Sequence, residues 1–277
     1  MITLGEYLSL NEKLMIFGKV AYPKFGNVVI LAGGAGSGKG FQKSNLLGIE
    51  GKSFDVDALK ELAVKSTKFA AKVKEETGHD IKSFDMKNPD NVGKMHDILS
   101  SVYNITNKSD QTVFASILAS DAERKPNLIF DVTLKDLSKL ESITRNAQEL
   151  GYSKTNIHIV WVVNDISVAI DQNAKRSRVV PDEILMATHE GAALTMKKIL
   201  DMGDKLLKYM DGAIYVSFNR VGTDTTIAKS GKGGAYVKDA NYILVKKQGS
   251  PQLSSAELGD AVYNKIKDYV PKVNTWD

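Results

Sequence analysis

The sequence predicts an α/β fold in which a parallel sheet of about five strands is covered by helices on both faces. Short apolar runs of strand length alternate along the chain with longer stretches of helical periodicity. This alternation is typical of parallel sheets that are built from strand–helix–strand units. The apolar runs are also continuous, as expected for strands that are buried on both faces. Both observations favour a sheet between two layers of helices.

Five short segments are assigned to the strands of this sheet. The first is a continuous apolar run that breaks directly into glycines, and the second, at 52–55, is a short strand before a helical pattern. The expected strands span residues 28–32, 52–55, 127–131, 157–163 and 213–218. Trp161 belongs to the most apolar run after the first, so we expect its side chain to lie in the core.

Helices are expected between these strands. They span residues 39–47, 56–74, 134–150, 166–176 and 181–210. Gly151 follows the third of them in the position that glycine takes after a helix end, and Pro181 suits the first turn of the last. An amphipathic helix is also expected at residues 3–19, before the first strand.

Two segments are interpreted as additions to this core. Residues 76–125 are polar, and we expect a loop at 79–91 and helices near 95–103 and 111–124. Residues 219–250 are rich in glycine and predict a loop with a hairpin or an edge strand. A terminal helix follows at 255–269. The expected organisation is one domain, 1–277, with a core at 27–218, an insertion at 76–125 and a C-terminal extension at 219–277. Ser254 or Ser255 is the expected cap of the terminal helix.

The composition fits a globular protein without disulfides. The 277 residues are 43% hydrophobic and carry a net charge of +4, which excludes disorder for most of the chain. Cysteine is absent, so thiolate metal sites and thiol nucleophiles are excluded. Glu6, Glu12 and Lys13 interrupt the apolar N-terminal stretch, and no run approaches the roughly 20 apolar residues of a membrane span. We therefore expect a cytoplasmic protein without a membrane partner.

The strongest motif is a phosphate-binding loop directly after the first strand. Residues 33–39 read GGAGSGK, which matches G-x-x-x-x-G-K between a strand and a helix. Glycines let successive backbone N–H groups point at phosphate oxygens, and Lys39 neutralises the β- and γ-phosphates of a nucleotide, for which ATP is the expected cofactor. The expected phosphate-binding residues are Gly33, Gly34, Ala35, Gly36, Ser37, Gly38, Lys39, Gly40 and Phe41. A glycine-rich turn with a chance lysine is the alternative, and the strand–loop–helix context argues against it.

One position departs from this motif. The Ser or Thr that normally binds Mg²⁺ after the lysine is replaced by Gly40, and Phe41 follows. Adenylate kinases are similar in having Lys-Gly at this place, and their metal is held by nucleotide oxygens and water. Ser37 and Ser44 are candidate substitutes for the missing hydroxyl, although Ser44 also fits a plain helix residue.

Carboxylates follow the second and third strands. Asp55 and Asp57 come at the end of 52–55, where ligands collect in open α/β sheets, and either can accept a proton from an attacking hydroxyl. The alternative is that one of them caps the following helix. Asp131 ends the third strand, with Thr133 two residues later. An aspartate in this position orients Mg²⁺, often through water, so Asp131 is the candidate metal residue.

Two arginines follow the fourth strand and its helix. Arg176 and Arg178 stand just before Val180 and Pro181. Phosphoryl transfer requires positive charge against the migrating group, and arginines on a lid often provide it. The alternative is a solvated basic helix end that complements the helix dipole.

Taken in order, these segments resemble the zeta-toxin-like P-loop kinases. The phosphate loop is followed by FDVDALK, NLIFDVTL, a helix ending in ELGY, and NAKRSRVVPDEIL, so the resemblance covers about residues 27–200. It implies a P-loop kinase-like three-layer fold and an ATP- and Mg²⁺-dependent transfer of the γ-phosphoryl group to a hydroxyl. By position it implies that Asp57, with Asp55 adjacent, is the general base, and that either Arg176 or Arg178 is the lid arginine. Asp131 and Thr133 lie in NLIFDVTL and correspond to the acidic residue and the threonine of this segment in the family. The family usually has Glu in place of Asp131.

The resemblance leaves the acceptor open. The best-known members phosphorylate UDP-N-acetylglucosamine, and related bacteriophage kinases, which act in the host cytoplasm, phosphorylate 5-hydroxymethyluridine in DNA. We expect the insertion at 76–125 to recognise the acceptor. Five lysines of the tail slightly favour a phosphate-rich acceptor such as DNA, with surface solubility as the alternative. They are Lys229, Lys232, Lys238, Lys246 and Lys247.

Two further expectations complete the interpretation. A nucleotide-dependent ATPase switch or binding protein, without a phosphorylated acceptor, is the alternative function. The four histidines are widely spaced and form no ligand pattern, so none is expected to bind metal. They are His79, His96, His158 and His189.

Overall fold

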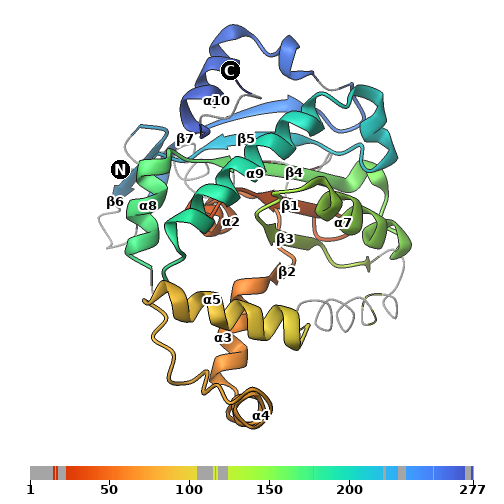
Figure 1. Cartoon of the computed structure of the whole chain (residues 1–277). Coiled ribbons are helices and arrows are strands. Elements are labelled where there is room, and N and C mark those ends of the chain that lie inside the picture. The colour runs from red at the N-terminus through yellow and green to blue at the C-terminus, as the bar shows by residue number, and fades with distance from the viewer. Residues whose placement is uncertain are drawn as a thin grey trace.

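A seven-stranded sheet forms the centre of the protein (Figure 1). The computed structural model describes residues 15, 17, 23–104, 115, 117, 124–176, 178–220, 223–229, 235–251, 253–271 and 276. The predicted segments 3–19 and 111–124 and the glycine-rich loop at 230–234 therefore lie largely or wholly outside the described residues. Within those residues, no helix is both long enough and apolar enough to cross a membrane.

The sheet has the strand order β2-β3-β1-β4-β5-β7-β6. Its strands are β1 (Val28–Ala32), β2 (Lys52–Asp55), β3 (Leu128–Val132), β4 (Ile157–Val163), β5 (Ile214–Phe218), β6 (Thr225–Lys229) and β7 (Ala235–Lys246). The first five strands pair in parallel, whereas β7 is antiparallel to β5 and β6 is antiparallel to β7. The predicted parallel sheet of five strands and the hairpin in the tail are both confirmed.

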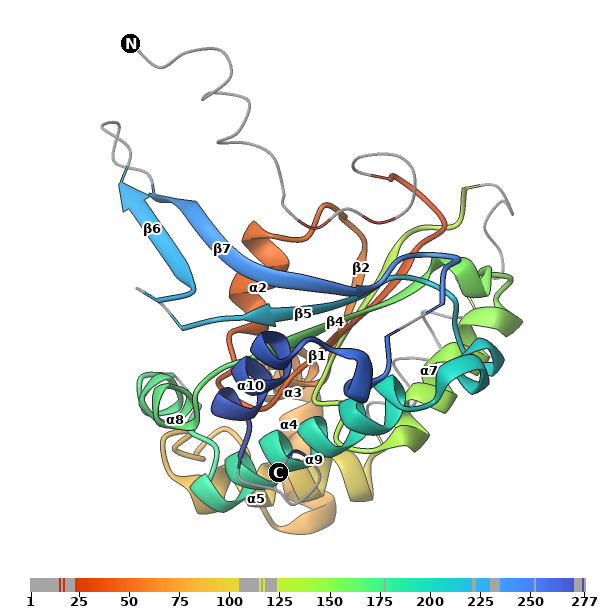
Figure 2. The same ribbon diagram turned by 90° about the horizontal axis from the view of Figure 1, so that it is seen from above.

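Helices lie on both faces of this sheet, as Figure 2 shows. They are α2 (Lys39–Asn45), α3 (Val56–Lys65), α4 (Thr67–Thr77), α5 (Pro89–Asp97), α7 (Leu137–Glu149), α8 (Ile166–Ala174), α9 (Asp182–Leu200) and α10 (Asp260–Tyr269). Short helical turns add Ile98–Val102, Lys154–Asn156, Gly203–Lys208 and Ser255–Glu257. Helices α7, α9 and α10 bury their apolar sides against one face of the sheet, where Trp161 is 2% exposed, as predicted. Helices α3, α4 and α5 share a separate apolar cluster and lie together below the sheet in Figure 1.

Several predicted helices have different bounds in the structure, and α5 begins at Pro89, inside the segment 79–91 that was expected to be a loop. The helix expected at 56–74 is broken at Ser66, because the Ser66 hydroxyl accepts a hydrogen bond from the backbone N–H of Phe69 and caps α4. The helix expected at 181–210 ends at Leu200, and the backbone of Gly203 then takes a left-handed conformation with φ +53°.

The terminal helix also begins later than expected. Ser254 caps the short turn at Ser255–Glu257 in a reciprocal arrangement with Glu257. Helix α10 starts only at Asp260, after Gly259. The capping signal at Ser254 was therefore genuine, but it serves a single turn and not the terminal helix.

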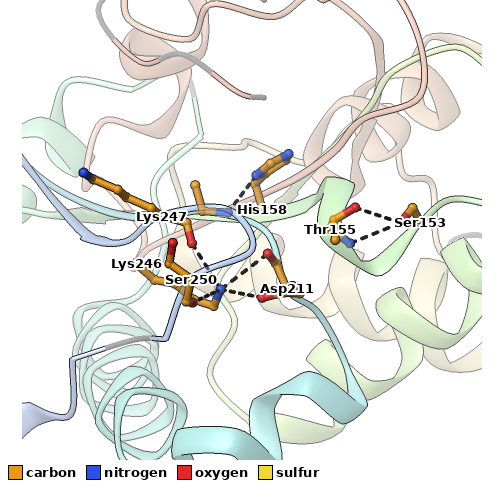
Figure 3. A network of polar contacts seen from close by, with 8 residues as sticks. Ser153, Thr155, His158, Asp211, Lys246, Lys247 and Ser250 are labelled. Atoms are coloured by element: carbon orange, nitrogen blue, oxygen red, sulfur yellow. Dashed lines mark hydrogen bonds and ion pairs between the residues drawn. The ribbon is translucent and has the colours of Figure 1, made fainter. Parts of the chain in front are cut away.

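One of the tail lysines, Lys246, proves to be a buried structural residue. Its side chain is 2% exposed, and its Nζ contacts Asp211 Oδ1 at 2.7 Å, the backbone O of Asp211 at 3.4 Å, and the carbonyl oxygens of Lys247 and Ser250 at 3.2 and 2.7 Å (Figure 3). Counting Lys246 among the acceptor-binding lysines was wrong, because a buried amine with four acceptors cannot reach a ligand. Lys247 is exposed, and the side chains of the other three lysines lie outside the description.

Next to this network, His158 is a buried neutral histidine. Its Nδ1 accepts a hydrogen bond from the backbone N–H of Ala213 at 2.9 Å, and its Nε2 donates to Asn27 Oδ1 at 3.3 Å. Burial, followed by the charge of Lys246, lowers the pKa of His158 to about 3. The side chain therefore stays uncharged in the folded protein at every physiological pH.

We expect the protein to lose stability as the pH falls below 6.5, in part because of His158. Between pH 6.5 and 3 the unfolded chain binds a proton on this ring that the folded protein does not bind. The difference corresponds to about 1.4 kcal/mol per pH unit. Urea unfolding between pH 6.5 and 5 measures this slope in the wild type and in His158→Asn, whose Oδ1 can still accept from Ala213. A smaller slope in the variant is expected, and equal slopes would contradict the assignment.

Candidate active site

The phosphate loop lies between β1 and α2 and is packed closely against α8 and the segment after β5. Gly36 and Gly38 have left-handed backbones, with φ +74° and +93°. A Cβ at Gly36 would lie 2.6 Å from the carbonyl oxygen of Ala169 in α8, and one at Gly38 would lie 1.8 Å from Asn219 Nδ2 after β5. Side chains are therefore excluded at both positions by conformation and by space. The loop has the shape that the motif predicted because its neighbours leave room for glycine alone.

Lys39 lies over this loop and beside the end of β3. Its Nζ donates to the carbonyl oxygens of Gly33 and Gly34 at 2.8 and 3.2 Å and lies 3.8 Å from Asp131 Oδ1. Asp131 is the register partner of Asp55 in the neighbouring strand β2. One cation and two carboxylates from three different segments therefore meet at the carboxyl ends of the parallel strands, which is where ligands bind in open α/β sheets.

A cavity of about 740 Å³ opens in front of these residues. Lys39, Asp55, Asp131, Thr133 and Arg178 all line it, although they are far apart in the sequence. Residues of α5 in the insertion, including Val92 and His96, form another part of its wall. The cavity thus joins the phosphate loop to the segment that was expected to recognise an acceptor.

Arg178, and not Arg176, lines the cavity. Arg178 is 9% exposed, and two contacts hold the segment around it. The buried Asn173 side chain bonds both the N–H and the carbonyl of Val180, at 3.0 and 2.7 Å. The N–H of Val179 donates to the carbonyl oxygen of Met86 in the insertion, at 3.0 Å. The arginine segment, residues 178–180, is thereby attached both to α8 and to the insertion.

Asp57 is the second residue of α3, and its side chain lies outside the description. Asp55, by contrast, is the last residue of β2 and lines the cavity. The geometry therefore places Asp55 at the cavity, while the choice of Asp57 as the general base stays a prediction.

The residues present fit an Mg²⁺ ion that is held partly by nucleotide oxygens. Asp55 and Asp131 offer adjacent carboxylates, which are ligands that Mg²⁺ prefers. Neither Ser37 nor Ser44 lines the cavity, and the Ser37 hydroxyl is buried without a hydrogen-bond partner. Among the described residues, no three His, Asp or Glu side chains are grouped so as to hold a metal by themselves. Phosphate oxygens and water would have to complete the coordination.

Two pairs of residues at this site were not found by sequence reasoning. Lys60 in α3 is 6% exposed, with its Nζ 2.6 Å from His96 Nδ1 in α5, and both line the cavity. Thr188 and His189 in α9 bond the backbone of the phosphate loop. No spacing in the sequence indicates either pair, because each depends on which elements meet in the folded chain.

The fold and this site together define a P-loop kinase-like α/β protein. Its phosphate loop follows the first strand, and its carboxylates lie at the ends of strands β2 and β3. Residues 67–213, just over half of the chain, match the family described as Zeta toxin. The chain therefore belongs to the zeta toxin family. The matched segment contains Asp131, Thr133 and both arginines, and it begins after the phosphate loop.

The chain is also similar to solved structures, at low sequence identity. A chain of the AvrRxo1-ORF1:AvrRxo1-ORF2 complex with sulphate ions is 13% identical, with a TM-score of 0.50, over 90% of this chain and 65% of that one. The same complex with ATP gives 12% identity and a TM-score of 0.47, over 91% and 65% of the two chains. A structure from the PezAT toxin–antitoxin system of Streptococcus pneumoniae gives 12% and 0.42, over 78% and 75%. The protein thus spans less than two thirds of the AvrRxo1 chain, and no curated protein sequence matches it.

Proposed function

We propose that the protein transfers the γ-phosphoryl group of ATP to a hydroxyl group of a second substrate. The observation that carries this proposal is that Lys39, Asp55, Asp131, Arg178 and residues of helix α5 of the insertion line one and the same cavity. A cavity of about 740 Å³ is large enough for a phosphate chain and part of an acceptor. Membership of the zeta toxin family supports the same class of reaction.

In this reaction the chain's own residues hold the phosphates and move one proton. The N–H groups of the phosphate loop and Lys39 bind the β- and γ-phosphates. Asp131 and Asp55 would hold the Mg²⁺ that accompanies ATP, and the ion would neutralise charge on the phosphates. Asp57, or Asp55 beside it, takes the proton of the acceptor hydroxyl. The hydroxyl oxygen bonds to Pγ, the bond from Pγ to the bridging oxygen breaks, and ADP leaves. Arg178 stabilises the charge on the migrating group.

The acceptor is expected to bind against α5. This wall of the cavity combines the apolar Val92 with His96 and the buried Lys60. A nucleotide, a nucleotide sugar such as UDP-N-acetylglucosamine, and DNA containing 5-hydroxymethyluridine are the candidates. The test is incubation with γ-labelled ATP and Mg²⁺ against these acceptors, plain DNA and RNA. Label on one acceptor supports the proposal. ATP hydrolysis that a partner stimulates without any labelled acceptor would favour an ATPase switch.

Replacing Arg178 with alanine is expected to lower turnover by about 10²–10³-fold while changing ATP affinity much less. A cation that meets charge developing during transfer acts mainly in the transition state. Arg176→Ala is the matched control, because Arg176 lies two residues away and does not line the cavity. Steady-state kinetics and ATP titration of both variants make the comparison. An equal loss of affinity and turnover in Arg178→Ala would indicate ground-state phosphate binding instead.

A further inference from the structure

Helix α9 holds the middle of the phosphate loop through two adjacent side chains. Thr188 Oγ1 accepts a hydrogen bond from the N–H of Ala35 at 3.1 Å and donates to the carbonyl oxygen of Leu185 at 2.7 Å. His189 Nε2 donates to the carbonyl oxygen of Ala35 at 2.7 Å. Both backbone polar groups of Ala35, its N–H and its carbonyl oxygen, are therefore hydrogen-bonded to α9. The two bonding residues are adjacent and lie about 150 positions later in the sequence.

The side chains around these two hydrogen bonds are also closely packed. His189 is 6% exposed, and a Cβ at Gly34 would lie 2.1 Å from its Cδ2. Burial, opposed by the bond to Ala35 and assisted by the charge of Lys39, lowers the pKa of His189. The imidazole is therefore neutral with its proton on Nε2, because a carbonyl oxygen can only accept. A neutral ring beside the phosphate loop donates one directed hydrogen bond.

We propose that Thr188 and His189 are positioning residues for the phosphate loop and that they set its affinity for ATP. With the peptide groups of Ala35 fixed by α9, the remaining loop N–H groups keep the orientation in which they converge on phosphate. Preorganised donors bind more tightly than donors that must first be ordered. The proposal rests on the proposed function, since it takes ATP as the ligand of this loop.

The same helix connects the loop to the arginine segment. Helix α9 starts at Asp182, directly after Val180 and Pro181, which line the cavity with Arg178. Thr188 and His189 follow about two helical turns later. The phosphate loop and the arginine segment are thus both attached to helix α9. Because the acceptor is expected to bind against α5, loosening the contact between α9 and the loop should weaken ATP binding and leave acceptor binding unchanged.

Matched pairs of variants separate hydrogen bonding from packing. Thr188→Val keeps the shape but removes the hydroxyl, whereas Thr188→Ser keeps it. His189→Met removes the donor, whereas His189→Gln places an amide nitrogen near the position of Nε2. Thr195→Val makes the same change as Thr188→Val at a buried position farther along α9, away from the loop. The measurements are calorimetric ATP affinity with Mg²⁺, the KM for ATP and for acceptor, and the melting temperature.

We expect Thr188→Val and His189→Met to weaken ATP binding by about tenfold, because each leaves a polar group of Ala35 without its partner. Thr188→Ser, His189→Gln and Thr195→Val should stay within about twofold of the wild type, and the KM for acceptor should not change. Unchanged ATP affinity in Thr188→Val and His189→Met would overturn the proposal. So would a loss that Thr195→Val reproduces, since that is a general effect on stability. A wild type that binds no ATP would refute the proposed function as well.

Discussion

Replacing Lys39 with alanine is expected to reduce ATP-dependent phosphorylation by at least about 10²–10³-fold while the protein stays folded. Its Nζ contacts loop carbonyls and lies near Asp131 at the cavity, so the change removes charge from the phosphate site without opening the core. Calorimetric ATP titration, a phosphorylation assay and the melting temperature give the three readouts.

Lys43→Ala is the matched control for this variant. Lys43 belongs to the same helix α2 and loses the same charge, but its Nζ donates to Ser53 and it does not line the cavity. We expect it to keep nearly full activity. Phosphorylation by Lys39→Ala at the wild-type rate would rule out the phosphate loop as the ATP site.

Asp57→Asn is expected to lower acceptor phosphorylation by about 10²–10⁴-fold, with ATP binding retained, if Asp57 is the general base. The amide has nearly the same size but cannot take the proton. If Asp57 merely caps α3, asparagine should replace it with almost no effect, because the two residues cap equally well. A rate assay with the labelled acceptor distinguishes these outcomes.

Asp55→Asn is the necessary companion, because Asp55 lines the cavity beside Asp131. If Asp55 helps to hold Mg²⁺, Asp55→Asn should raise the Mg²⁺ concentration that is needed for the half-maximal rate. An inactive Asp55→Asn at saturating Mg²⁺, together with an active Asp57→Asn, would transfer the role of base to Asp55. Full activity of both variants would refute this mechanism.

Most strands could be predicted from the sequence, because a strand that is buried on both faces is a short, continuous apolar run. The bounds of β1, β2 and β4 are those expected. β1 and β4 are such runs and end before glycine or a polar residue, whereas β2, with the sequence KSFD, has only one buried residue. Helix ends were less predictable. A serine in the middle of a helical pattern fits a solvent-facing residue as well as a cap, and at Ser66 the cap prevailed.

Cavity-lining residues were easiest to predict where they lie at the end of a strand or in the loop that follows it. Lys39, Asp55 and Asp131 fall into that group, because parallel strands bring their carboxyl ends to one edge of the sheet. Lys60, His96, Thr188 and His189 could not be found in this way, since helical periodicity shows which side of a helix is apolar and not which loop it will meet. Arg178 lines the cavity and Arg176 does not, and this difference depends on the packing of the folded chain, which no spacing encodes.

The burial of Lys246 also allows local unfolding to be followed by chemical labelling of lysine. Lysine amines are acylated by active esters when they are free in water, yet Lys246 Nζ contacts four oxygen atoms and its side chain is 2% exposed. Its neighbour Lys247 is exposed and should be labelled at once. Peptide mapping of the pair Lys246 and Lys247 therefore compares the labelling of a buried amine with that of an exposed one in the same molecule. The ratio of the two labels follows unfolding of this end of the sheet without any knowledge of the substrate.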